Sequence, residues 1–243
     1  MSFVFDWIKS QEFAPSTLGM LVNPSYLIRS QLAKTLQRWS PQMHGTMLDF
    51  GCGTSPYRKF FEVDTYLGLE IVAPGHPDRS RSANLQYSGE QIPLADLSVD
   101  CVLMTEVLEH VFNPAEVLIE FHRILRPDGK VLITCPFVWP LHEEPYDYAR
   151  YTPYALRHLA SNAGLEVVAI ERTGSWCLVL AQLLIQYVVQ MTCPSDGRLN
   201  RLGKIFWCTL LNPLAIIADR IFPSNDQIYF NNILVLRKAS ISS

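Results

Sequence analysis

The segment that most constrains the fold of this 243-residue chain lies at residues 47–55. A short apolar run, residues 47–50, leads into a turn that contains Gly51 and Gly53. The run that follows, residues 57–61, is expected to open a helix. A strand, a tight glycine turn and a helix N-terminus let a nucleotide-like ligand approach the backbone closely. The segment therefore predicts a Rossmann-like α/β sheet with a ligand at this turn.

A second apolar run, residues 66–71, carries an acidic residue where ribose recognition is expected. Glu70 stands about 20 positions beyond the first strand, where a carboxylate accepts hydrogen bonds from ribose hydroxyls. A fingerprint for NAD would also place a third glycine shortly after Gly53, and Pro56 occupies that position. A nicotinamide-dependent dehydrogenase is therefore the disfavoured rival.

Two later segments complete a recognisable pattern. They are IPLADLSVDCVLMTEVLEHV at residues 92–111 and RILRPDGKVLIT at residues 123–134. Together with LDFGCGTSPY they resemble class I S-adenosylmethionine-dependent methyltransferases of the type-11 methyltransferase-domain group, over roughly residues 45–172. The resemblance implies a doubly wound, mostly parallel seven-stranded sheet whose last strand is antiparallel.

The resemblance also implies S-adenosyl-L-methionine as the cofactor. Its contacts are expected from Asp49, Gly51, Cys52, Gly53, Glu70, Ile71, Thr105, Glu106 and His110. Cys52 is expected to be a small loop residue and not a nucleophile, and His110 either contacts the cofactor or is a structural histidine. Family members often carry an acidic residue that reads the adenine. In this chain Ser88 and Gly89 occupy the matching positions, so the sequence does not assign the residue that contacts the adenine.

The acceptor side is expected in the loop after the fifth strand, residues 136–151, which resembles a subgroup linked to glycan or cell-surface polymer pathways. His142 is the candidate general base. Trp139, Tyr146, Tyr148 and Tyr151 are candidate walls of the substrate pocket, or else they pack the loop down. His142, Glu143 and Glu144 lack the spacing of a metal-binding motif such as HExxH, so no metal is expected.

Composition narrows the partners and the compartment. A net charge of −3 and a pI near 6.1 give no global attraction to nucleic acid. Six cysteines without CxxC spacing are typical of a reducing compartment, and Cys101 and Cys135 are expected to be buried. No signal peptide is recognisable at the N-terminus. A cytoplasmic protein is therefore expected.

The chain is expected to divide into an N-terminal helical extension, residues 1–44, and a methyltransferase domain, residues 45–243. Helices are expected from Pro24 to Trp39, from Asn113 to Asp128 and from Thr152 to Gly164, and strands at 165–170 and 228–237. Asp100 is expected to satisfy nearby backbone donors at the start of a strand.

An apolar helical insertion is expected at residues 176–222. Its first helix carries one narrow polar stripe, Gln182, Gln186 and Gln190. Its second apolar run is interrupted by Pro213, and both runs are expected to be too short to span a bilayer. The insertion is expected to be a lid or a dimer face, or else a peripheral membrane element in which Arg198, Arg201 and Lys204 meet anionic lipid.

The sequence thus predicts methyl transfer to a small-molecule, sugar or lipid-linked acceptor. A cofactor-binding scaffold without turnover is the non-enzyme alternative.

Overall fold

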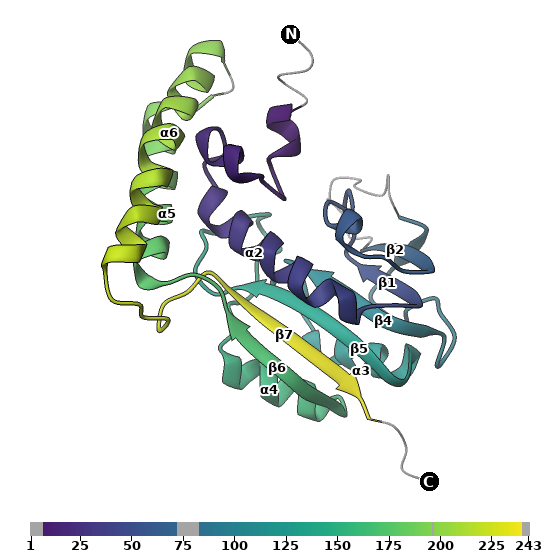
Figure 1. Cartoon of the computed structure of the whole chain (residues 1–243). Coiled ribbons are helices and arrows are strands. Elements are labelled where there is room, and N and C mark those ends of the chain that lie inside the picture. Colours follow the sequence, from purple (N-terminus) through teal and green to yellow (C-terminus); the bar gives the residue numbers. More distant parts are fainter. Residues whose placement is uncertain (1–6, 72–82, 196, 240–243) are drawn as a thin grey trace. The chain divides into compact units, whose positions relative to one another are not determined.

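The computed structural model describes residues 7–71, 83–195 and 197–239, with the backbone only at Arg198 (Figure 1). The first six residues of the expected N-terminal extension lie outside this description. The chain divides into two compact units. A sheet unit consists of residues 37–171 and 232–243, and a helical unit consists of residues 1–36 and 172–231.

A seven-stranded sheet organises the first unit, as the sequence predicted. Its strands are β1 (Thr46–Phe50), β2 (Thr65–Ile71), β3 (Leu85–Tyr87), β4 (Val99–Thr105), β5 (Leu125–Pro136), β6 (Leu165–Arg172) and β7 (Asn231–Lys238). Their order in the sheet is β3-β2-β1-β4-β5-β7-β6, with β7 antiparallel. Strands β3, β2, β1, β4 and β5 pair in parallel. This is the Rossmann-like fold that the resemblance implied.

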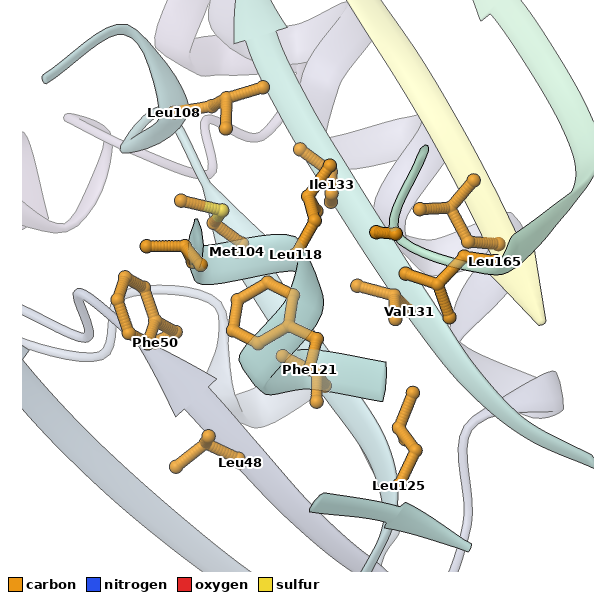
Figure 2. Close-up of a cluster of buried hydrophobic side chains, with 14 of the residues drawn as sticks. Leu48, Phe50, Met104, Leu108, Leu118, Phe121, Leu125, Val131, Ile133 and Leu165 are labelled. Carbon is orange, nitrogen blue, oxygen red and sulfur yellow. The ribbon is translucent and has the colours of Figure 1, made fainter. Parts of the chain in front are cut away.

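The core lies between the central strands and two helices, α3 (Pro114–Ile124) and α4 (Pro153–Asn162). Strands β1 and β4 and the second half of β5, residues 131–136, are almost entirely buried, as expected for parallel strands covered on both faces. The apolar stripe of α3 reaches this core through Val117, Leu118, Phe121 and Ile124. Figure 2 shows Phe121 beside Phe50, and their ring centroids lie 5.2 Å apart in an edge-to-face arrangement.

Several predicted boundaries are confirmed, with their local causes. Helix α2 spans Tyr26–Trp39, so its predicted end is confirmed, while it begins two residues after the predicted Pro24. The Thr152 hydroxyl caps α4 by accepting from the Ala155 N–H, and Gly164 has a left-handed φ of +71° just after that helix. The Asp100 carboxylate accepts from the Thr46 N–H at 2.7 Å and from Arg126 at 2.6 Å. Cys101 and Cys135 are buried free thiols.

Three other predicted boundaries are wrong. Residues 57–61 contain only a 3-10 turn, η3 (Arg58–Phe60), because the chain must return to the sheet at Thr65 and a longer helix has no room to form. Helix α3 ends at Ile124 and not near Asp128, since Pro127 disfavours helical backbone at the residue before it. Strand β7 begins at Asn231, three residues later than predicted.

The helical unit contains η1 (Thr17–Leu21), most of α2, α5 (Trp176–Thr192) and α6 (Arg198–Ile221). The predicted polar stripe of α5 faces inward at two of its three positions. Gln182 is fully buried and donates to the Pro24 carbonyl at 2.7 Å, and Gln186 donates to the Ser25 hydroxyl at 3.0 Å. The large apolar side chains that α5 exposes are Trp176, Leu180, Leu184, Tyr187 and Met191, beside the exposed polar residues Gln190 and Thr192.

Helix α6 continues through Pro213, so the expected interruption is wrong. A proline removes one hydrogen bond of the helix, while neighbouring turns keep theirs. The Asn212 side chain also ties this turn to the Met20 and Asn23 carbonyls. The segment Leu199–Ile221 is long and apolar enough to cross a membrane by length and composition, with a mean hydropathy of 1.3. This corrects the expectation that both apolar runs are too short.

Candidate functional site

A pocket of about 210 Å³ lies where the chain leaves the carboxyl ends of four parallel strands, β1, β2, β4 and β5. This edge is where open α/β sheets bind their ligands. The residues that line the pocket are Gly51, Gly53, Glu70, Ile71, Glu106, Val107, His110, Phe112, Glu143, Tyr146 and Tyr148. Segments with a predicted role in cofactor binding and in acceptor binding thus line one cavity.

The two glycines after β1 have different physical roles. Gly51 has a φ of +71°, and a Cβ there would lie 2.6 Å from the Val107 side chain, so this glycine permits close packing. Gly53 has a φ of +51°, and a Cβ there would meet nothing within 4 Å. The Gly51 and Cys52 amides both donate to the Leu69 carbonyl, which fixes the turn on β2. Gly53 therefore leaves open space on the pocket side of a fixed turn.

Glu70 lies near the end of β2, where its carboxylate connects the glycine turn after β1 to the end of β2. Its Oε2 accepts from the Gly53 N–H at 2.8 Å, and its Oε1 accepts from the Ile71 N–H at 3.1 Å. A carboxylate has about four acceptor sites, so capacity is left for a ligand with hydroxyl groups. The residue predicted to bind a ribose thus also holds the glycine turn in place.

Three residues predicted to contact the cofactor are not part of the lining that the described residues form: Asp49, Cys52 and Thr105. Asp49 is buried at the end of β1, where its carboxylate accepts from the Tyr66 hydroxyl. Burial raises the pKa of Asp49 to about 7, although the Tyr66 hydrogen bond opposes this shift. Burial also raises the pKa of the Cys52 thiol to about 12, which does not suit a nucleophile.

The loop after β5 places the candidate base in a polar cluster. The backbone N–H of His142 donates to Asp147 Oδ2 at 3.0 Å. The two terminal nitrogens of Arg150 donate to Oδ1 and Oδ2 of the same carboxylate at 2.5 and 2.7 Å. The hydrogen bonds from Arg150 lower the pKa of Asp147 to about 2. Burial and the neighbouring His110 lower the pKa of His142, which favours the neutral imidazole. His142 is therefore held in place and is able to accept a proton.

The four aromatic residues predicted to bind substrate divide into two pairs. Tyr146 and Tyr148 line the pocket, and the Tyr148 ring packs edge-to-face on Phe112 at 5.3 Å between centroids. Trp139 is partly buried outside the lining. Tyr151 packs against the hydrophobic core, and burial raises its pKa to about 12.

Glu109 is a buried polar residue of this region to which the sequence analysis assigned no role. Glu109 lies in a 3-10 turn, η5 (Leu108–His110), and is fully buried. Neither of its carboxylate oxygens has a hydrogen-bond partner. Burial, together with the charge of Glu106, raises its pKa well above the ordinary value. Its signal in the sequence is a Glu-His pair inside the apolar run LEHV, just past a buried strand.

A parallel sheet whose first two strands end in a glycine turn and an acidic residue defines a domain that binds a nucleotide-type cofactor. Similarity to a known protein family specifies the class of domain further. The family model of the methyltransferase domain matches residues 48–133. These residues are therefore similar to the methyltransferase domain family, and the chain has the fold of class I S-adenosylmethionine-dependent methyltransferases.

Individual relatives agree with this assignment. An uncharacterized methyltransferase from Mycobacterium bovis is 33% identical over 104 residues, which cover 39% of this chain and 40% of that protein. The chain spans less than half the length of the first curated relatives that it matches.

Two solved structures share the fold. A SAM-dependent methyltransferase from Archaeoglobus fulgidus has a TM-score of 0.54 at 15% identity, covering 98% of this chain and 99% of that one. A putative sarcosine dimethylglycine methyltransferase from Galdieria sulphuraria has a TM-score of 0.53 at 17% identity, covering 85% and 86%.

The pocket suits S-adenosylmethionine by its chemistry. Glu70 offers acceptors for ribose hydroxyls, and the open side of Gly53 gives a ligand access to the backbone. Ile71, Val107 and Phe112 supply apolar surface of the kind that an adenine ring packs on. The residues present therefore fit the cofactor that the family uses.

Proposed function

We propose that this protein is an S-adenosylmethionine-dependent methyltransferase that acts on a small-molecule, sugar or lipid-linked acceptor. The observation that carries the proposal is the shared pocket. The glycine turn and Glu70 form one part of its wall, and Tyr146 and Tyr148 form another. A small acceptor is supported by the likeness to a solved structure described as a putative sarcosine dimethylglycine methyltransferase.

The bound cofactor supplies a methyl group on a positively charged sulfur, which is a good leaving group. The main task of the protein is then to align the reactants and to exclude water. Alignment contributes up to about 7–11 kcal/mol to lowering a barrier. We assign Gly53, Glu70 and Ile71 to holding the cofactor. We assign Tyr146 and Tyr148 to closing the pocket around the acceptor.

A general base is needed only where the acceptor is a hydroxyl group. His142 is the residue that we assign to this role, because burial lowers the pKa of its imidazole and its ring lies against His110, which lines the pocket. Removal of the acceptor proton contributes a factor of about 10²–10⁴ to the rate. An amine acceptor in its neutral form would need no such help.

Two measurements separate this proposal from its rivals. Calorimetry with S-adenosylhomocysteine and with NAD distinguishes a methyltransferase from a dehydrogenase, and we expect binding of the former alone. Methyl release from the cofactor in the presence of candidate acceptors distinguishes an enzyme from a scaffold without turnover. Tight binding of NAD, or a failure to bind S-adenosylhomocysteine, would overturn the proposal.

Gly53→Val tests the position of the ligand. The branched side chain would enter the open space beside the turn, so we expect at least a tenfold loss of S-adenosylhomocysteine affinity. Gly53 also has left-handed backbone, and any side chain there adds strain. Gly164→Ala is the control for that strain, because Gly164 has a φ of +71° and lies outside the pocket lining. Unchanged affinity in a folded Gly53→Val variant would contradict the assignment.

A further inference from the structure

Three potential metal ligands converge beside the pocket. The Nε2 atoms of His110 and His142 lie 3.1 Å apart, although these residues are 32 positions apart in the sequence. Oε1 of Glu109 lies 3.8 Å from the first nitrogen and 3.7 Å from the second. Two nitrogen ligands bound to one tetrahedral zinc ion at about 2.0–2.1 Å stand roughly 3.3 Å apart. The three atoms are therefore close enough to share one cation.

The other nitrogen of each imidazole is already used. His110 Nδ1 lies 2.9 Å from the Tyr146 carbonyl oxygen, which can only accept, so this nitrogen donates. His142 Nδ1 lies 3.3 Å from the Pro140 carbonyl and 3.2 Å from Asp147 Oδ2, so it donates as well. In neutral imidazoles both Nε2 atoms then carry lone pairs. Lone pairs that face each other at 3.1 Å repel unless a proton or a metal ion lies between them.

This arrangement has the hydrogen bonding of a metal site. Histidine ligands almost always donate their second nitrogen to a carbonyl or a carboxylate, which orients the ring and fixes its tautomer. Tyr146, Pro140 and Asp147 provide those acceptors here. Each ring is thus oriented with its free lone pair toward the other ring and toward Glu109.

Glu109 gives an independent indication of a ligand. Its side chain is fully buried, and neither oxygen has a hydrogen-bond partner. Burying a carboxylate without a partner is costly, and buried charges in proteins are paired or bound to metals. Arg150, a cationic side chain whose charge acts on Glu109, is bound to Asp147 through both of its terminal nitrogens. The buried carboxylate therefore lacks a matched cation among the described residues.

The surrounding charges also favour a cation. Glu106 lies close enough for its charge to act on Glu109, and it accepts a hydrogen bond from Thr134 at 2.8 Å. Asp147 stands on the far side of the His142 ring, and Arg150 balances it. Glu106, Asp147 and Arg150 act electrostatically on Glu109 or His142, and Glu143 lines the same pocket as His110. Of these neighbours of Glu109 and the histidines, three are acidic and one is basic.

We propose that Glu109, His110 and His142 bind one divalent transition-metal ion. Two imidazoles and one carboxylate suit zinc and neighbouring first-row metals better than magnesium or calcium, which prefer oxygen ligands. With three protein ligands, the ion keeps at least one position for water or a substrate oxygen. The proposal departs from the sequence expectation of no metal, because His110 and Glu109 lie far from His142 in the chain.

A catalytic role for the ion rests on the proposed methyltransferase function. His110 also lines the pocket, so the ion would stand at its wall. It would bind a hydroxyl oxygen of the acceptor and make it more acidic, and the released proton would pass to water. His142 would then act as a metal ligand and not as the general base.

The test uses the full chain, first treated with a chelator and then dialysed against Zn²⁺ or Co²⁺. We expect one metal equivalent per chain by elemental analysis, and a visible absorption band typical of nitrogen and oxygen ligands for Co²⁺. Glu109→Gln and His142→Ala are each expected to weaken Zn²⁺ binding at least tenfold. His158→Ala is the control, because this exposed histidine pairs with Asn162 on α4 and should leave binding unchanged.

These measurements test the metal site separately from the proposed methyltransferase function. Failure of the wild-type chain to bind one equivalent would overturn the proposal, as would variants that bind Zn²⁺ like the wild type. If Glu109→Gln does not fold, His142→Ala still tests the site, since its side chain is 30% exposed. S-Adenosylhomocysteine binding is measured on the same samples. Cofactor binding without metal binding overturns only the metal site, and the reverse result overturns only the proposed function.

Discussion

Replacing Glu70 with alanine gives the sharpest test of how the pocket holds its cofactor. The carboxylate accepts from the Gly53 N–H at 2.8 Å and from the Ile71 N–H at 3.1 Å, so it both shapes the turn and faces the pocket. Hydrogen bonds to a charged group contribute about 1.5–3 kcal/mol each. Loss of one such bond to a ribose hydroxyl corresponds to roughly a 10- to 150-fold loss of affinity. We therefore expect Glu70→Ala to weaken S-adenosylhomocysteine binding by at least tenfold.

The turn itself complicates this variant, because the Gly53 amide also loses its acceptor. A 2′,3′-dideoxy analogue of the ligand separates the two effects. Loosening of the turn would weaken both ligands equally, whereas loss of the ribose contact would weaken only the natural one. We expect the dideoxy analogue to bind the wild type and Glu70→Ala with affinities that differ much less than those of the natural ligand.

Calorimetry measures all four affinities at one salt concentration, since charge interactions depend on ionic strength. Glu62→Ala is the matched control, because it removes an exposed carboxylate that lies outside the pocket lining. The reasoning would be refuted if the analogue distinguished wild type from variant as strongly as S-adenosylhomocysteine does. In that case Glu70 supports the turn and does not contact the ribose.

Three further predictions concern the acceptor side, the sheet and the helical unit. His142→Ala should reduce methyl transfer while S-adenosylhomocysteine affinity changes by less than about twofold, and an equal loss in both would place His142 at the cofactor. Asp100→Ala should lower the free energy of unfolding, measured in urea, by about 1–3 kcal/mol, because the Thr46 amide and Arg126 lose their acceptor. Asp96→Ala is the control, since it breaks an exposed ion pair and should lower the free energy of unfolding by less than about 1 kcal/mol. Burial acts to raise the pKa of Asp100, but its hydrogen bonds with Thr46 and Arg126 outweigh this effect and lower the pKa. The contribution of Asp100 to stability should therefore be lost as the pH falls through that pKa. We expect the exposed apolar surface of α5 and α6 to bind anionic vesicles in a flotation assay. Binding should weaken at high salt and in the double variant Arg201→Ala/Lys204→Ala. A monodisperse dimer that does not bind vesicles would contradict this prediction.

Local features of the fold could be predicted because they depend on near neighbours. The strand that leads into Gly51 and Gly53 follows from an apolar run and from the left-handed backbone that glycine allows. The cap at Thr152 and the stop at Gly164 follow from equally local rules. The order of the motifs along the chain then indicated the whole sheet, because each one resembles a known family at its usual spacing.

Properties that depend on packing could not be predicted in this way. Gln182 is polar, yet it is fully buried because the Pro24 carbonyl needs a donor there, and the apolar side chains beside it are left exposed. Tyr151 could equally have lined the pocket or packed the loop down, and it packs against the core. Periodicity shows that a helix or loop has two kinds of surface. It does not show which surface finds a partner.

The polar cluster beside the pocket depends most on tertiary structure. The sequence indicated His110 and His142 separately, with different roles, and gave no reason to pair them. The turn after β4 and the loop after β5 bring the Nε2 atoms of the two rings to 3.1 Å, with the buried carboxylate of Glu109 beside them. Parallel strands place their carboxyl ends at one edge of the sheet, so side chains far apart in sequence meet there. Neighbouring residues set the conformation of each turn, but only the assembled sheet decides which turns share a site.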